Sequence, residues 1–309
     1  MLDEKHKSSY LEGMNKLPIQ TRVTILNMLV EGSSMRSISR ITGVSINTVT
    51  KLLEDAGRAC AEFHDQTVVA VNSTEVQCDE IWSFCYAKEK NVPEAKAAPD
   101  GSGDVWTWTA IDRHSKLIVA FQVGDRSART AREFMFDVAY RLAKRVQLTK
   151  DGNAAYLKAV ADAFAADVDY AMLVKQYGEP TGVTPSERRY SPADCTGAIK
   201  EPIFGKPDMD KVSTSHVERA NLSMRMGMRR FTRLTNGFSK KLENHLHMLS
   251  LYFVHYNFVR MHKTLKMTPA MAAGVTNTLH DMTWLVSMID AAAPKPGPRG
   301  PYRKKDNSN

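Results

Sequence analysis

Strand-like patterns in the middle of the chain limit the folds that are open to it. Residues 75–88, EVQCDEIWSFCYAK, are apolar and aromatic at period two, as expected of a half-buried strand. Residues 104–113 and 116–124 have the same character and are joined by the turn His114-Ser115. Three strands with such short connections predict an antiparallel meander.

Helices and strands alternate after this meander. The predicted elements are a helix over 127–144, a short strand ending at Asp151, a helix over AAYLKAVADAFA, a strand over 170–177, and helices over 214–230 and 239–261. This order is that of the ribonuclease-H-like arrangement, an α/β fold whose mixed sheet has flanking helices on both faces. We place this domain at residues 70–275.

Three other segments lack such a pattern. The Pro- and Gly-rich, charged segment 178–212 is interpreted as an irregular insertion with one strand near Ile203. Residues 276–309 are predicted to form a C-terminal helix and then a disordered basic tail, because their last part is rich in Pro and Gly. Residues 1–14 show no apolar signal region and are interpreted as a disordered leader.

Residues 15–64 are predicted to form an all-α helix-turn-helix domain ahead of the sheet. A short helix, a turn at Gly43 and a second amphipathic helix capped by Ser45 follow the helix-turn-helix pattern. The apolar side of the second helix carries Val49, Leu52 and Leu53. The outer side, where such helices meet base edges and phosphates, carries Asn47, Thr48 and Lys51. The alternative is a helical hairpin used only for packing.

The positive charge of the chain is concentrated in one stretch. Between Arg219 and Lys266 there are ten Lys or Arg residues and one acid, Glu243, a net +9 against +8 for the whole chain. This favours a polyanionic partner, nucleic acid before membrane. No apolar run approaches the roughly 20 residues of a membrane helix. Four scattered cysteines without a CxxC pair indicate reduced thiols in a cytosolic protein and no zinc site.

Asp79 lies in the middle of the apolar strand CDEIWSF. A carboxylate on a central strand loses hydration and needs partners or a metal, whereas on an edge strand it could face solvent. Glu80 points to the opposite face and is the rival acid, with a salt-bridged neighbour as its alternative role. We prefer Asp79 because its face is less aromatic than that of Trp82 and Phe84.

Asp151 and Glu218 are the other candidate acids. Asp151 ends a strand before Gly152, where a carboxylate can face a cleft, although Asp-Gly is also a common turn pair. Glu218 begins a helix, and its spacing from Ser215 also fits an S-x-x-E capping box. Helical periodicity gives that helix one exposed face with Glu218, Asn221, Arg225 and Arg229. Three carboxylates suit two divalent ions in phosphodiester chemistry, and Mg²⁺ prefers such oxygen ligands.

Four stretches resemble the DDE transposases of the insertion-sequence-1 family, within the retroviral-integrase-like superfamily. They are CDEIWSF, LTKDGNAAYLKAV, STSHVERANLSMRMGMRRFTRLTNGFSKKLENH and YNFVRMHKTLKMTPAMAAGV, between about Val76 and Val275. The resemblance implies that two Mg²⁺ (or Mn²⁺) ions are held by the catalytic triad Asp79, Asp151 and Glu218. It implies that Arg225 holds DNA near the reacting phosphate. Asn221 is expected to orient the site or touch DNA, with a solvent-facing amide as the alternative.

Further DNA contacts are expected from the basic stretch, at Arg229, Arg230, Arg260 and Lys263. Many relatives carry an N-terminal zinc-binding module, but this chain has no cysteine before Cys60, so end recognition is expected to rest on residues 15–56. The implied activity is metal-dependent cleavage at the ends of an insertion sequence, followed by strand transfer. The expected partners are DNA, as terminal repeats and target, and further copies of the chain in a homodimer or higher oligomer.

The resemblance implies a cytoplasmic, nucleoid-associated protein of a bacterium or archaeon. Two alternatives remain. One is a ribonuclease-H-like nuclease that cuts without joining, because the same acids serve both reactions. The other is a non-catalytic DNA-binding protein derived from a transposase, although all three acids are intact.

Overall fold

The computed structural model describes residues 16–152, 155–165, 167–178, 195–232 and 236–293. The predicted leader and basic tail, and residues 179–194 of the predicted insertion, lie outside the described residues. Within them, no helix is both long and apolar enough to cross a membrane.

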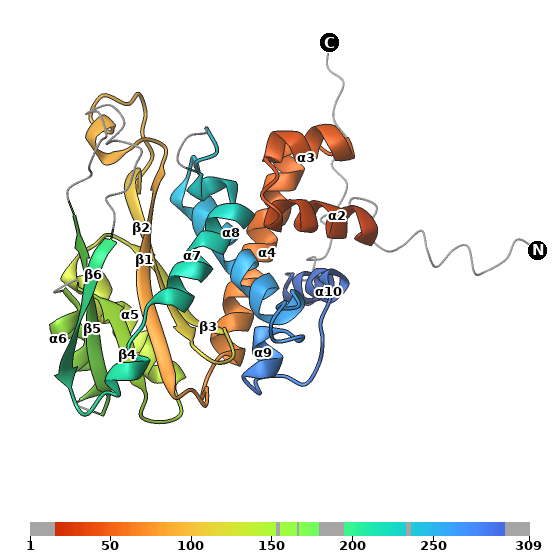
Figure 1. Cartoon of the computed structure of the whole chain (residues 1–309). Coiled ribbons are helices and arrows are strands. Elements are labelled where there is room, and N and C mark those ends of the chain that lie inside the picture. The colour runs from red at the N-terminus through yellow and green to blue at the C-terminus, as the bar shows by residue number, and fades with distance from the viewer. Residues whose placement is uncertain (1–15, 153–154, 166, 179–194, 233–235, 294–309) are drawn as a thin grey trace, which may run out of the picture.

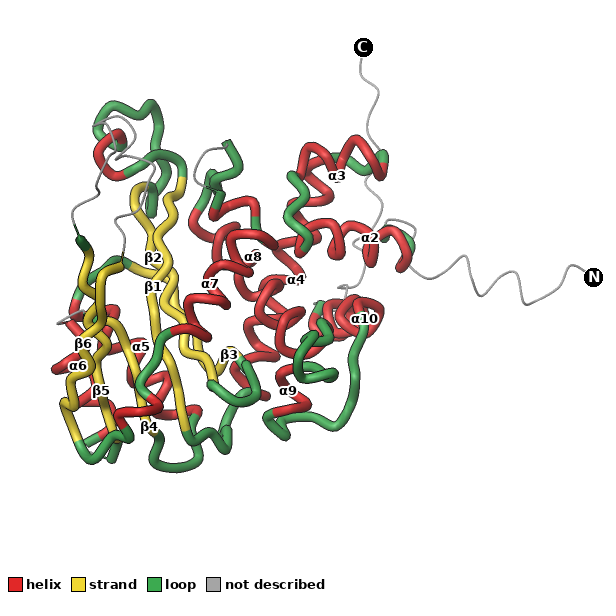
Figure 2. Tube along the Cα trace, viewed as in Figure 1, coloured by secondary structure: helices red, strands yellow, loops and turns green. Residues whose placement is uncertain are grey.

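Six strands form one mixed sheet in the order β3-β2-β1-β4-β5-β6 (Figures 1 and 2). They are β1 Glu75–Cys85, β2 Gly103–Asp112, β3 Ile118–Gly124, β4 Gln147–Asp151, β5 Asp169–Tyr177 and β6 Cys195–Phe204. β4 runs parallel to β1 and β5, and the other pairs are antiparallel. The predicted meander and the alternation after it are confirmed, and the arrangement is compatible with a ribonuclease-H-like fold.

Helices flank both faces of this sheet. They are α2 Ile19–Val30, α3 Met35–Thr42, α4 Ile46–Thr67, α5 Ala128–Arg141, α6 Ala155–Phe164, α7 Ser215–Gly227, α8 Leu242–Val254, α9 Pro269–Ala272 and α10 Met282–Ala292. Short turns of helix are η1 Glu89–Asn91, η3 Met209–Lys211, η4 Arg229–Phe231 and the π-helical His255–Val259. One core joins the sheet to α5 and α6 through Phe134 and Tyr156. A second core joins the opposite face to α7, α8 and the N-terminal helices.

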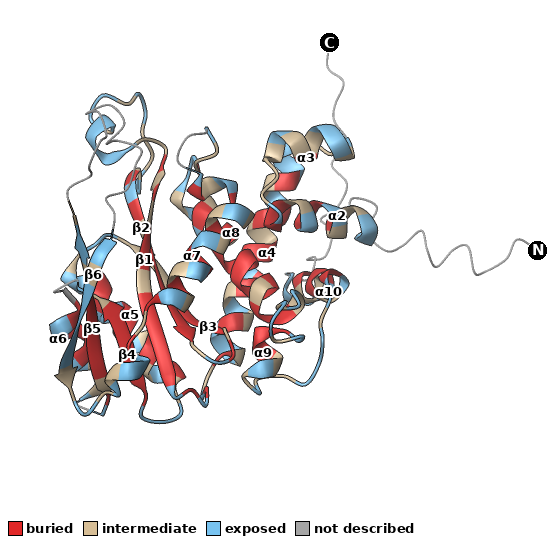
Figure 3. Ribbon diagram, viewed as in Figure 1, coloured by how far each residue is buried: buried red, intermediate tan, exposed pale blue. Residues whose placement is uncertain are grey.

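β6 is longer than the sequence pattern indicates. A strand was expected only near Ile203, but β6 spans ten residues and pairs antiparallel with β5. It forms an edge of the sheet and is mostly exposed (Figure 3). Because neither face of such a strand is deeply buried, its sequence shows no apolar alternation, and it can include Pro202.

The N-terminal helices have the predicted local geometry. Gly43 ends α3 in the left-handed region with φ of 71°, and the Ser45 hydroxyl accepts from the Thr48 amide at 3.2 Å to cap α4. Val49, Leu52 and Leu53 are buried as predicted. α4 then continues to Thr67 and packs along α8, so closely that a Cβ at Gly57 would lie 2.3 Å from that of His247. The DNA-binding role of residues 15–64 stays a prediction.

Asn257 connects the end of α8 to the sheet. Its side-chain oxygen accepts from the Ile118 amide at 3.0 Å, and its side-chain nitrogen donates to the Ile118 carbonyl at 2.9 Å. This amide therefore satisfies both backbone groups of Ile118, as a neighbouring strand would. The π-helical turn that carries Asn257 thus contributes to packing on β3.

Candidate active site

Strand register brings Asp79 and Asp151 together. Cys78 of β1 pairs with Lys150 of β4 in a parallel ladder, so the next residue on each strand, Asp79 and Asp151, lies on the same face. The carboxylate oxygens of Asp79, Asp151 and Glu80 all lie within 4.8 Å of one another. Asp79, Asp151 and Glu218 line one cleft of about 650 Å³, between β1, β4, β5 and the start of α7.

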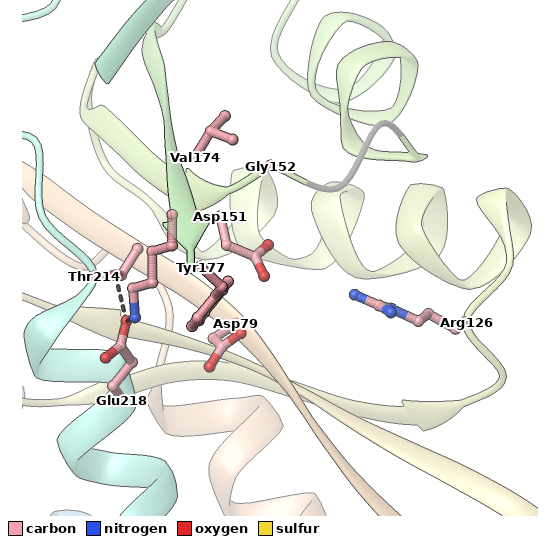
Figure 4. Close-up of a pocket in the computed structure, with 9 residues that line it drawn as sticks. Asp79, Arg126, Asp151, Gly152, Val174, Tyr177, Thr214 and Glu218 are labelled. Carbon is pink, nitrogen blue, oxygen red and sulfur yellow. Dashed lines mark hydrogen bonds and ion pairs between the residues drawn. The ribbon is translucent and has the colours of Figure 1, made fainter. Parts of the chain in front are cut away.

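Figure 4 shows the carboxylates of Asp79 and Asp151 turned toward the same space. Glu218 lies beside Thr214 at one side of this space, and Arg126 extends toward it from the other. The three acids predicted from sequence thus share one cleft. Their catalytic role stays a prediction.

The carboxylate of Asp79 is only partly compensated in this cleft. Burial raises its pKa to about 6, and repulsion from Asp151 and then Glu80 adds to that effect. Its partner is a neutral amide, because the side-chain nitrogen of Asn221 donates to Oδ2 of Asp79 at 2.7 Å. A carboxylate with a raised pKa beside a second acid has a strong electrostatic preference for an added cation.

Asn221 is buried, so its interpretation as a solvent-facing amide on an exposed ridge is wrong. Its oxygen accepts from the Thr109 hydroxyl at 3.4 Å while its nitrogen holds Asp79. α7 packs on β1 and β2 here, which turns this position of the helix toward the sheet. The position suits the alternative in which Asn221 orients the site, and it does not suit a contact with DNA.

Glu80 belongs to a buried ion pair directly beside the cleft. Its carboxylate bonds Lys150 Nζ, and both side chains are almost fully buried. Lys150 also donates to Oδ1 of Asp151 at 2.7 Å and lies 3.6 Å from the centre of the Tyr156 ring. Arg126 approaches the second oxygen of Glu80 at 3.4 Å. The salt-bridged role considered for Glu80 is confirmed, and Lys150 links this pair to the cleft.

Lys150 was missed in the sequence interpretation. A signal was present, since a lysine that ends an apolar strand and precedes an acid raises the same question as Asp79 does. Arg126 and Lys175, which also line the cleft or its acids, have no comparable signal, because their neighbours come from distant segments.

Glu218 does not form the capping box that its spacing from Ser215 suggested. The N-cap of α7 is Thr214, and the Ser215 amide donates to the Ser213 hydroxyl instead. The Glu218 carboxylate accepts from the Thr214 hydroxyl and from Lys175 Nζ. The capping alternative is therefore wrong, and the carboxylate stays at the cleft.

Gln77 of β1 performs the capping instead. Its side-chain oxygen accepts from the amides of His216 and Val217 at 2.9 and 3.1 Å. Amides in the first turn of a helix have no partner within the helix, and here Gln77 of β1 supplies one. These hydrogen bonds hold the start of α7 over the sheet. Because Gln77 is two residues before Asp79, this bond also sets the position of Glu218 relative to that acid.

The donor set fits a divalent ion. Asp79 and Asp151 offer hard carboxylate oxygens at one cleft, which suits Mg²⁺ or Mn²⁺ completed by water and phosphate. Glu218 could join them once its bond with Lys175 is released, because its side chain is 41% exposed at the same cleft. The buried partners of Glu80 make it a poorer ligand.

The predicted DNA contacts fall in separate places. Asn47, Thr48 and Lys51 are exposed on the outer face of α4, and Arg225 is half-buried on α7. Arg229 and Arg230 follow α7 and line a groove that also includes the first residues of α8. Arg260 and Lys263 are exposed beyond the other end of α8 and its π turn, roughly 25 Å away along the helix. The basic stretch is therefore divided between two ends of one helix.

The raised pKa of Asp79 predicts a pH-dependent difference in stability between wild type and Asp79→Asn. The folded-state pKa of about 6 exceeds the ordinary 3.8, so the folded wild type loses stability as pH rises between these values. Asn has no such loss. In metal-free buffer we expect the unfolding free energy of Asp79→Asn, minus that of the wild type, to increase by up to about 3 kcal/mol from pH 4 to pH 7. Urea unfolding across this range measures it, and a pH-independent difference would contradict the assigned charge state.

No protein-family model matches the chain, and no curated protein matches it. Among solved structures, the chain is similar to the crystal structure of a pre-cleavage Mos1 transpososome, with 11% identity and a TM-score of 0.21. The match covers 52% of this chain and 60% of that chain. The chain thus spans less than two thirds of the length of the structure it matches, and a likeness at this level supports no conclusion about fold or function.

Proposed function

We propose that this chain is a DNA transposase of an insertion sequence, which cuts element ends and joins them to target DNA in a metal-dependent reaction. The observation that carries the proposal is the register of β1 and β4, which places Asp79 and Asp151 in one cleft with Glu218. The raised pKa of Asp79 supports a cation-binding role. The resemblance of the sequence to insertion-sequence-1 transposases gives the finer assignment.

Within this proposal, Asp79 and Asp151 hold the divalent ions, and Glu218 completes the set after leaving Lys175. Two bound ions would activate the attacking oxygen and stabilise the leaving oxygen of the phosphodiester. Asn221 keeps the Asp79 carboxylate in one orientation through its 2.7 Å hydrogen bond. Arg126 faces the cleft from the side opposite Glu218 and is suited to a phosphate oxygen of the substrate.

Asn47, Thr48 and Lys51 of α4 would contact the DNA at the element ends. Target DNA is the second substrate. Two ends must be joined in one event, so a homodimer or higher oligomer on DNA belongs to the proposal. The expected site of action is the nucleoid of a bacterial or archaeal cell.

A strand-transfer assay tests the proposal. The substrate is a pre-nicked duplex made from the inverted repeats that flank the coding sequence, with a plasmid as target and Mg²⁺ or Mn²⁺ present. We expect joined products that disappear when EDTA removes the metal, because the carboxylates alone cannot activate the 3′-hydroxyl. Cleavage without joining would instead identify a nuclease. Binding with neither reaction would identify a non-catalytic DNA-binding protein.

A further inference from the structure

A basic groove lies between the start of α3 and the described residues 228–230 and 236–240, which lie between α7 and α8 in the chain. It measures about 820 Å³, and Figure 1 shows α3 facing this part of the chain at the end of the molecule where α7 finishes. Its cations are Arg36, Arg229, Arg230 and Lys240. Among the described residues that line it there is no Asp or Glu, so the groove has an unbalanced positive charge.

The far wall of this groove is held in place by the sheet. Ser239 is joined to β1, because the Tyr86 amide donates to its carbonyl at 2.8 Å. The same serine accepts from Nε of Arg230 at 2.7 Å. Lys240 lies 4.0 Å from the centre of the Phe238 ring. These contacts orient two of the cations before any ligand arrives, which lowers the entropy lost on binding.

Arg230 is desolvated, and the described residues that line the groove give it no acidic partner. Desolvation lowers the pKa of its guanidinium to about 10, so it remains protonated at neutral pH. Its hydrogen-bond partner, Ser239, is neutral. An incoming anion would therefore gain more here than at a solvated surface arginine.

The neutral residues of the groove suit a phosphate backbone. Hydroxyl and amide side chains stand among the cations, at Ser33, Ser34, Thr50, Asn236 and Asn244. Arg and Lys together with Ser, Thr and Asn are the residues that contact phosphate and sugar in protein–DNA complexes. Thr50 belongs to α4, the helix predicted to meet DNA, so the groove adjoins the predicted recognition face.

The length of α7 relates this groove to the acid cleft. Glu218 lines the cleft and Arg229, eleven residues later, lines the groove. α7 ends at Gly227, so its residues from Glu218 onward span about 14 Å at 1.5 Å per residue. Arg229 follows two residues later, so Glu218 and Arg229 are roughly 14–20 Å apart. One strand of B-form DNA advances 3.4 Å per base pair, so this distance corresponds to about five base pairs.

We propose that the groove binds the phosphate backbone of the same DNA duplex that enters the acid cleft, about five base pairs from the reacting phosphate. This inference rests on the proposed function for its substrate. It adds Arg36 and Lys240, at opposite walls of the groove, to the residues that position DNA for the reaction.

A binding experiment without metal tests the groove separately from catalysis. The full chain is titrated into a labelled duplex of about 30 base pairs in EDTA, and anisotropy is followed over a range of salt concentrations. For the double variant Arg36→Gln/Lys240→Gln we expect roughly tenfold weaker binding at moderate salt. The slope of log K against log salt should fall in magnitude by about 2, at roughly 0.9 for each lost phosphate contact.

A charge-matched control is Arg129→Gln/Lys158→Gln, whose exposed side chains lie on α5 and α6 across the sheet. It should keep the wild-type slope. An equal loss in both double variants, or an unchanged slope in the groove variant, overturns the inference. A wild-type protein that binds duplex as described but neither cuts nor joins would refute the proposed function and leave the groove standing as a DNA site.

The position along the DNA is tested with neutral methylphosphonate linkages placed one at a time in a cleavable element end. Linkages about five base pairs from the cut should weaken wild-type binding, and they should not weaken the Arg36→Gln/Lys240→Gln variant further. If the sensitive linkages lie elsewhere, or if wild type and variant respond equally, the proposed path of the duplex is wrong.

Discussion

Asp79→Asn is expected to lower metal-dependent DNA cleavage by roughly three orders of magnitude, about 4 kcal/mol of transition-state stabilisation. Asn has nearly the shape of Asp, and its oxygen can still accept from Asn221, but it brings no negative charge to a divalent ion. Single-turnover cleavage of an element-end duplex in Mn²⁺ measures the effect.

Asp100→Asn is the matched control, because it removes one negative charge from an exposed loop before β2. It should cleave at the wild-type rate. We expect Asp79→Asn to be folded, since removing a buried charge that faces Asp151 should make the metal-free protein more stable at neutral pH, and urea unfolding of the variant checks this. An Asp79→Asn protein that keeps more than about a tenth of wild-type activity would contradict the metal-binding role.

Lys150→Met is expected to destabilise the fold by about 3–5 kcal/mol. Lys150 is fully buried, and its partner Glu80 has a side chain that is 1% exposed. Methionine fills similar space but leaves the Glu80 charge with Arg126 alone, at 3.4 Å and from a half-exposed side chain. Removing one partner of a buried ion pair destabilises the fold by far more than the intact pair stabilises it. The reason is that the remaining charge is then neither paired nor solvated.

Lys175→Met provides the comparison on the other side of the cleft. Its partner Glu218 is 41% exposed, so solvent replaces the lost contact and the expected change is below about 1 kcal/mol. The double variant Lys150→Met/Glu80→Gln should recover a large part of the stability, because no buried charge is left over. Urea unfolding of the three variants measures this, and equal effects of Lys150→Met and Lys175→Met would contradict the buried-pair assignment.

The order of the sheet elements could be predicted because the alternation of apolar and polar residues along a strand reflects which side chains are buried. The strands that carry alternation, such as β1 and β2, have one face in each core, and each lies close to its predicted limits. The acids at 79 and 151 could be singled out for a related reason. A charge inside an apolar strand, or at the end of one, indicates compensation nearby.

Contacts between distant segments had no such signal. Asn221 looked exposed on a helical wheel, yet it lies 142 residues from the Asp79 carboxylate that it holds. Glu218 fitted a local capping box, but Gln77 satisfies the helix start from 139 and 140 residues away. A spacing rule describes which positions of a helix share a face. It does not say which side chains of another element will contact that face.

The chain's own pattern was sufficient to predict a mixed sheet, its order of elements, a basic C-terminal region and three candidate acids, because each depends on short-range periodicity or on composition. Folding decided which acids are compensated and how. It paired Lys150 with Asp151 and Glu80, and Lys175 with Glu218. It also brought the neutral amide of Asn221 into a hydrogen bond with Asp79. These pairings depend on strand register and helix packing, where electrostatic energy varies with distances that no local pattern encodes.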